Sequence, residues 1–205
     1  MDLNALTIFK LSYGSHKSAE DGVCLMEAVA WMEGEPHSDH PQCACPIIGN
    51  FAMRINDKMP DEWRQKLVPF IPRLVGTRSK EHELARAEYL TWQAIRVFVP
   101  FAMDIANLSV WAAKLREFKG TLVNVHTLLI EAKAYAAANA AAAYASAAAY
   151  VADAYAANAA AAVAIWQAAI NTLSGVLKIG PSGKPVSQWE ARLSDYRKLR
   201  SIEVE

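Results

Sequence analysis

Apolar residues recur every three or four positions through most of this sequence, and this spacing gathers them on one face of an α-helix. The pattern occurs in several segments between residues 18 and 120 and again after residue 187. The first 17 residues are weakly patterned and could form a short strand or an extended arm. No run of alternating apolar and polar residues is long enough to indicate a sheet. We therefore predict an all-α fold.

Capping residues, prolines and glycines predict where these helices begin and end. Ser18 is expected to cap a first helix with Asp21 as its partner, and Gly34 is expected to end that helix. Pro46 suits the first turn of a second helix, and Pro100 is expected to bend a later one. The other expected boundaries are a restart at Pro60, breaks at Pro69, Pro72 and Gly76, caps at Ser79 and Ser187, a restart at Asn107 or Ser109, and an end at Gly120. The expected core residues are Trp31, Phe51, Trp63, Phe70, Trp92, Phe98 and Trp111.

Residues 134–164 form an alanine-rich segment, in which 21 of the 31 residues are alanine. Alanine has the highest helix propensity because it loses no side-chain entropy in a helix. No glycine or proline occurs from Thr121 to Ser174, so an unbroken helix there would be about 80 Å long. That length exceeds a compact domain of this size, so the helix either protrudes or folds back as a helical hairpin. The expected turn points are Asn139, Asp153 and Asn158.

An apolar stripe with an eleven-residue repeat runs along the alanine-rich segment and beyond it. Its members, spaced alternately by seven and four positions, are Tyr144, Val151, Tyr155, Ala162, Trp166, Leu173 and Leu177. The alanines beside the stripe would let another helix approach closely. The stripe could bind a partner or a second copy, with contacts from Tyr144, Val151, Tyr155 and Trp166, or it could pack on the N-terminal half of its own chain.

Composition narrows the classes of function and the expected location. The net charge is zero, from 21 acidic and 21 basic residues, which argues against a dedicated nucleic-acid-binding protein. Asp153 and the tyrosines of the alanine-rich segment argue against a membrane span. Three cysteines and a start without an apolar core of signal-peptide length predict the cytoplasm and no disulfide framework. The predicted domains are a helical N-terminal domain at 1–120, the alanine-rich helical segment at 121–178, and a linker with a C-terminal helix at 179–205.

One loop concentrates residue types that bind metal ions. His37, His40, Cys43 and Cys45 lie within nine residues, and zinc accepts four such ligands in a tetrahedral arrangement. Their spacing is not that of a standard zinc finger. The alternatives are that the histidines bond to the backbone or to acids, and that the cysteines are small buried residues. We therefore expect no cofactor, and zinc is the one possible cofactor that the sequence indicates.

A histidine–carboxylate pair from the same region could support acid–base chemistry. The candidate pairs combine His37 or His40 with Glu27, Glu33 or Glu35, with Cys43 or Cys45 as a nucleophile. Such residues are common in surface loops, so we assign no catalytic residue from the sequence. The motifs of α/β-hydrolases, P-loop nucleotide-binding proteins and Rossmann dehydrogenases do not occur in the sequence.

Four stretches of the sequence resemble an uncharacterised family of bacterial and phage proteins. They are MEAVAWMEGEPHSDHPQCACPII (26–48), PFIPRLVGTR (69–78), EYLTWQAIRVFVPFAMDIANL (88–108) and the alanine-rich tract through NTLSGVL (171–177). Members of this family pair a helical N-terminal region with an alanine-rich helical tail. The tail of this chain is shorter and poorer in Arg and Asp than is typical of the family. The resemblance implies a phage or bacterial cytoplasmic setting, and it implies no activity.

Taken together, these patterns predict a non-enzymatic protein–protein interaction or scaffold protein. Its alanine-rich helix would make close contacts within a homo-oligomer or with another protein, such as a host component bound by a phage accessory protein. No nucleic acid or membrane is expected as a partner. The alternative is a zinc-binding module or metal-dependent enzyme built on the loop from His37 to Cys45.

Overall fold

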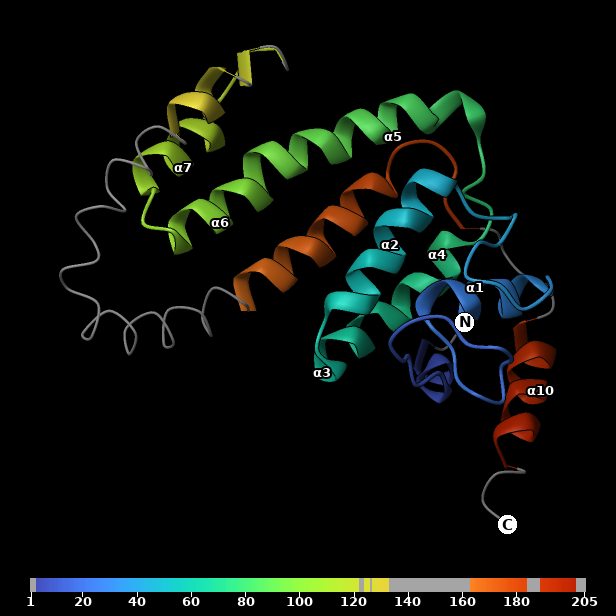
Figure 1. The fold of residues 1–205 in the computed structure, drawn as a ribbon. Helices are drawn as coiled ribbons and strands as arrows, with labels where there is room; N and C mark the ends of the chain where they lie inside the picture. The colour runs from blue at the N-terminus through green and yellow to red at the C-terminus, as the bar shows by residue number, and fades with distance from the viewer. Residues whose placement is uncertain (1–2, 122–123, 126, 133–162, 184–188, 202–205) are drawn as a thin grey trace, which may run out of the picture. The chain divides into compact units, whose positions relative to one another are not determined.

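The computed structural model describes residues 3–121, 124–125, 127–132, 163–183 and 189–201. The regular secondary structure of these residues is helical, with no strand, which confirms the predicted all-α class; one isolated parallel bridge joins Leu11 and Val23. The α-helices are α1 (Leu25–Glu33), α2 (Pro46–Lys58), α3 (Asp61–Arg64), α4 (Ile71–Leu74), α5 (Lys80–Gln93), α6 (Val99–Ile105), α7 (Ser109–Arg116) and α10 (Trp189–Ser201), with a further helix at residues 163–176. The structure also has helical residues at 124–125 and 127–132, the 3₁₀ helices η1 (Leu3–Ile8) and η2 (Gln65–Phe70), and the π-helix η3 (Ala94–Phe98) (Figure 1).

The chain divides into two compact units. Unit 1 comprises Met1–Tyr89 and Ala169–Glu205, and unit 2 comprises Leu90–Ala168. Unit 1 therefore joins the N-terminal helices to the C-terminal end of the chain. The domain boundaries expected at residues 120 and 178 stay a prediction.

The first predicted helix begins later than expected. Residues 18–22 form turns, with the Ser18 hydroxyl donating to Asp21 at 3.3 Å, and α1 starts only at Leu25. Gly22 has φ +142°, which interrupts a helical backbone. The N-cap is instead Cys24, whose sulfur accepts from the Glu27 N–H while the Glu27 carboxylate accepts from the Cys24 N–H. Gly34 ends the helix at φ 80°, as predicted.

The core of unit 1 is more aliphatic than predicted. Helix α1 packs against α2, α4 and α10, and seven of its nine residues are buried. Trp63 and Phe70 are buried as expected, but Trp31 and Phe51 are half-buried. Most of the interior is filled by residues without aromatic rings, including Leu6, Val23, Leu25, Val29, Met32, Ile48, Leu67, Ile71 and Leu74.

Helix α10 closes unit 1 by packing against η1 and α1 (Figure 1). The Tyr196 ring lies between Phe9 and Trp31, with ring centroids 4.5 Å and 5.5 Å away. The Trp31 indole N–H donates to the Arg192 carbonyl at 3.1 Å. The expected C-terminal helix is therefore present, and its expected cap, Ser187, lies outside the described residues.

A buried arginine fastens the segment after residue 176 to α5. The Arg86 guanidinium donates to the carbonyls of Thr77 at 2.5 Å, Ile179 at 2.9 Å and Pro181 at 2.9 Å. Arg86 is fully buried, so these three bonds replace the water that its charge would otherwise attract.

The helix that begins at Lys80 changes its hydrogen bonding before Pro100. The π-helix η3 precedes α6, at the position where a bend was expected. A proline lacks an N–H and crowds the preceding turn, and a π-helical segment is one way a helix accommodates it. Helix α6 ends at Ile105, Asn107 in the turn that follows has φ 59°, and α7 starts at Ser109, one of the two predicted starts.

The predicted long alanine-rich helix lies almost entirely outside the described residues, because residues 133–162 are not among them. The helix at 163–176 carries the end of the apolar stripe. Leu173 and Leu177 are buried in unit 1, so this end of the stripe packs within its own chain. Among the helices that the structure describes, none is both long enough and apolar enough to cross a membrane.

Candidate functional sites

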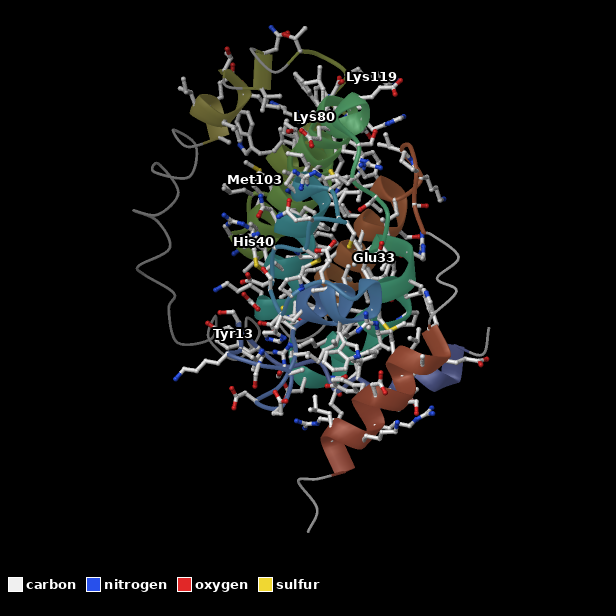
Figure 2. The ribbon with its side chains drawn as sticks, turned by 90° about the vertical axis from the view of Figure 1, so that its right-hand side faces the viewer. Tyr13, Glu33, His40, Lys80, Met103 and Lys119 are labelled. Carbon is white, nitrogen blue, oxygen red and sulfur yellow. The ribbon has the colours of Figure 1, made fainter. Side chains whose placement is uncertain are left out.

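The four predicted zinc ligands lie in different environments. His40 is exposed, with Nε2 3.7 Å from Asp39, whereas His37 is largely buried (Figure 2 labels His40). Cys45 is fully buried at the N-cap of α2, and its N–H donates to the Thr77 hydroxyl at 2.9 Å. Cys43 is half-buried, and its N–H donates to Glu35 at 2.7 Å.

The cysteine environment disfavours the thiolate that zinc requires. Burial, together with the negative charge of Glu35, raises the pKa of the Cys43 thiol to about 12. In the part of the chain that the structure describes, no group of three or more His, Cys, Asp or Glu side chains is arranged to hold a metal ion. The zinc site stays a prediction, and the loop has a visible structural role because Glu35 accepts from the backbone of Gln42 and Cys43.

A different cluster forms around the buried carboxylate of Glu27. Its side chain is only 1% exposed. One oxygen accepts from the His16 N–H at 2.7 Å, and the other accepts from the Cys24 N–H at 2.7 Å. His16 Nδ1 lies 2.7 Å from the second oxygen, and His37 Nε2 lies 3.5 Å from the first. Glu27 therefore joins the loop before α1 to the loop after it.

Hydrogen bonds keep Glu27 ionised despite its burial. Burial alone would raise the pKa of this carboxyl group. The bonds from the Cys24 N–H, the His16 N–H and the His16 ring outweigh burial and lower the pKa of Glu27 below its usual value. The cluster therefore holds a fixed negative charge next to two imidazole rings.

A serine hydroxyl extends the cluster. Ser12 Oγ lies 2.8 Å from His16 Nε2 and 3.2 Å from the carbonyl oxygen of Val23. Gly22 makes this contact sterically possible, since a Cβ there would lie 2.8 Å from the His16 ring and 3.0 Å from Ser12 Oγ. Ser12, His16 and Glu27 thus form a continuous hydroxyl–imidazole–carboxylate chain.

The hydroxyl end of this chain borders a cavity of about 1030 Å³ in unit 1. Ser12 and Gly22 line the cavity, together with the exposed Tyr13, which Figure 2 labels. The remaining lining residues are Thr7, Lys10, Leu11, Asp21, Asp61, Glu62, Arg64, Gln65, Val68, Pro69 and Arg200.

Sequence reasoning found part of this cluster. The expected pairing of His37 with Glu27 is present at 3.5 Å, although His37 Nε2 is closer, at 3.1 Å, to the His16 carbonyl oxygen. Ser12 and His16 were missed because they stand in a weakly patterned segment. Ser12 and His16 are four positions apart in the sequence. This spacing indicates a hydroxyl–imidazole–carboxylate chain only once the fold places Glu27 beside His16.

Unit 2 presents a second candidate, an association surface. Residues 95–103, here called the half-buried segment, have a largely apolar sequence. Their large apolar side chains are all half-buried, and these are Ile95, Val97, Phe98, Val99, Phe101 and Met103. Beyond it, Ile105 is 50% exposed at the end of α6 and Val110 is 65% exposed in α7. Apolar surface left open in this way marks interaction sites.

Of the four residues predicted to bind a partner, the structure describes one. Trp166 is half-buried in the helix at 163–176, whereas Tyr144, Val151 and Tyr155 lie outside the described residues. Their contact with a partner stays a prediction.

Comparison with known proteins adds no relative. No protein-family model, no curated protein and no solved structure matches this chain. The resemblance to a bacterial and phage family therefore stays a prediction.

Proposed function

We propose that this chain is an interaction or scaffold protein that associates with a second copy of itself through unit 2. The observation that carries the proposal is the half-buried segment, residues 95–103, whose apolar side chains lack the burial that α1 has in unit 1. Covering such surface is favourable by roughly 25 cal/mol per Å² of apolar area.

A second copy suits this surface on two grounds. The net charge of the chain is zero, so identical chains do not repel one another over long distances. The adjoining alanine-rich segment also supplies small side chains, which allow helices to approach closely. A strongly charged partner is not favoured, because the chain has no net charge to attract it.

The test is the oligomeric state measured by sedimentation equilibrium at micromolar concentration. Val110→Asp places an acid in the first turn of α7, where the helix dipole favours it, and Ile105→Lys places a base at the end of α6. Each change should therefore preserve the helices and weaken the dimer at least tenfold. The control is Leu84→Lys, which changes an exposed leucine of unit 1 and should leave the dimer intact. A monomeric wild-type chain overturns the proposal.

The zinc alternative has its own measurement, elemental analysis of the purified, untagged protein. Zinc bound by the loop would appear at about one ion per chain. It would be lost when His40 and Cys43 are both replaced by alanine. Equal zinc content in the wild type and this variant would remove the loop as the site.

A further inference from the structure

We infer that Ser12, His16 and Glu27 form a nucleophile, a base and a positioning carboxylate that hydrolyse carboxylic esters bound in the adjoining cavity. This activity is separate from the association proposed for unit 2, because all three residues and the cavity belong to unit 1. Neither experiment depends on the outcome of the other.

The order of contacts is the first argument. The Ser12 hydroxyl lies 2.8 Å from one nitrogen of His16, and the other ring nitrogen lies 2.7 Å from Glu27. Serine nucleophiles need an adjacent base, and that base needs a third group to orient it. In this arrangement the ionised Glu27 accepts a hydrogen bond from the Nδ1–H of His16, so Nε2 carries no proton and can accept the proton of Ser12.

The rigidity of Glu27 is the second argument. Two backbone N–H groups fix its oxygens at 2.7 Å each, so the carboxylate cannot rotate away from His16. A positioning group held in this way costs little reorganisation when the imidazole becomes charged. Gly22 contributes by leaving the space that Ser12 and His16 occupy.

A purely structural network would use the same atoms in another protonation state. A doubly protonated His16 would donate to both Glu27 and Ser12, and the hydroxyl would then donate to the Val23 carbonyl. Both arrangements use the 2.8 Å contact between Ser12 Oγ and His16 Nε2 and the 3.2 Å contact between Ser12 Oγ and the Val23 oxygen. They differ in whether Ser12 gives its proton to His16 or to Val23, and the labelling and hydrolysis experiments distinguish them.

The reaction balances with water as the only co-reactant. Ser12 Oγ bonds to the ester carbonyl carbon while its proton moves to His16 Nε2. The C–O bond to the alcohol breaks, the alcohol leaves with that proton, and an acyl-serine remains. Water then attacks the acyl carbon, His16 takes its proton and returns it to Ser12 Oγ, and the carboxylic acid leaves.

The cavity indicates the class of ester. Leu11, Val68 and Pro69 provide apolar lining, so a short acyl chain or an aromatic alcohol would fit there. Arg64 already donates to the carbonyls of Asn56 and Met59. Lys10 and Arg200 also place positive charge in the lining of this cavity.

Covalent labelling is the direct test. Phenylmethylsulfonyl fluoride should sulfonylate Ser12 with loss of fluoride, and peptide mass spectrometry would locate the label. Ser12→Ala should abolish labelling. The matched control is Ser18→Ala, which removes a serine of the same loop that contacts Asp21 instead of His16, and it should label like the wild type. No label on the wild type, or a label on another residue, overturns the inference.

Hydrolysis of p-nitrophenyl acetate tests the roles of the other residues. His16→Gln should reduce the rate at least about 100-fold. Glu27→Gln should reduce it similarly and change the pH profile, because the amide cannot hold the same His16 tautomer. Circular dichroism and a thermal melt show whether each variant is folded. A folded Ser12→Ala variant with wild-type hydrolysis, or folded His16 and Glu27 variants that label Ser12 at the wild-type rate, would contradict the inference.

Discussion

In unit 1, seven of the nine residues of α1 are buried, whereas none of the five residues of η3 in unit 2 is buried. The difference does not come from polarity, because the η3 sequence AIRVF is largely apolar. Unit 1 covers its helices with one another and with the C-terminal helix α10. The described helices of unit 2 bury only a few residues, namely Pro100, Ala112, Leu115, Val125 and Ala132. Among the described residues, the apolar side chains of unit 1 are therefore mostly buried within the unit, whereas those of unit 2 are mostly half-buried or exposed.

Two arginines provide the largest contrast between the units. Arg86→Met should lower the free energy of unfolding by about 3 kcal/mol, because a buried side chain loses three hydrogen bonds, to the carbonyls of the buried Thr77, the half-buried Ile179 and the exposed Pro181. Arg96 of unit 2 makes one bond to the Phe118 carbonyl and stacks on Trp92 at 4.2 Å. Arg96→Met should therefore cost only about 1 kcal/mol. Urea denaturation measures both, and equal losses would break the comparison.

Two positions on one helix test the same difference with aliphatic side chains. Leu173 is fully buried in unit 1, and Leu173→Ala should cost about 2–4 kcal/mol through lost burial and a residual cavity. Val163 is 53% exposed in unit 2, and Val163→Ala should cost less than about 0.5 kcal/mol in a monomeric sample. If dilution makes the Val163 effect disappear while a concentrated sample shows it, the surface is covered by self-association.

The helix boundaries were predictable wherever a single residue determines the backbone. Gly34, Pro46 and Ser109 mark ends or starts of helices in the structure as they do in the sequence pattern. The predicted start of α1 was wrong because Ser18 and Asp21 resemble a capping pair in the sequence. In the structure, Cys24 and Glu27 form the capping box of this helix. A cysteine is a weak acceptor and is not read as a cap from sequence.

The candidate cluster could not be derived in the same way, because it depends on tertiary packing. His16 reaches Glu27 because the fold places the loop at residues 12–16 beside the first turn of α1, and the bridge between Leu11 and Val23 joins the ends of this loop region. The positive φ of Gly22 and the burial of Glu27 are likewise products of the fold. His37 and Cys43 are close in the sequence and gave a clearer pattern, that of a metal site. In the structure they have different neighbours, because His37 lies near Glu27 and Cys43 bonds to Glu35.

Two glycines of unit 1 differ in how closely other atoms pack around them. Gly14 and Gly22 both have positive φ, at +77° and +142°, so alanine strains the backbone at either position. Around Gly14 no atom lies within 4 Å of an added Cβ, whereas at Gly22 the His16 ring would be 2.8 Å away. Gly14→Ala should cost about 1 kcal/mol, and Gly22→Ala should cost about 2 kcal/mol and also reduce Ser12 labelling. Equal costs in thermal melts would show that His16 moves aside freely.

Alkaline pH should weaken unit 1, because the buried thiols of Cys24 and Cys43 lie within it. Burial raises the pKa of the Cys24 and Cys43 thiols from 9.0 to about 12. Between these pH values the unfolded chain has lost protons that the folded chain still holds, so the free energy of unfolding falls as pH rises. Below about pH 9 the contribution is fully present.

Cys24→Ser keeps an N-cap acceptor for the Glu27 N–H and removes one of these thiols. From about pH 8.5 to about pH 10.5, this variant should lose about 2 kcal/mol less stability than the wild type. If the two lose stability equally, the Cys24 thiol titrates alike in both states, and α1 is more open to solvent than its burial indicates.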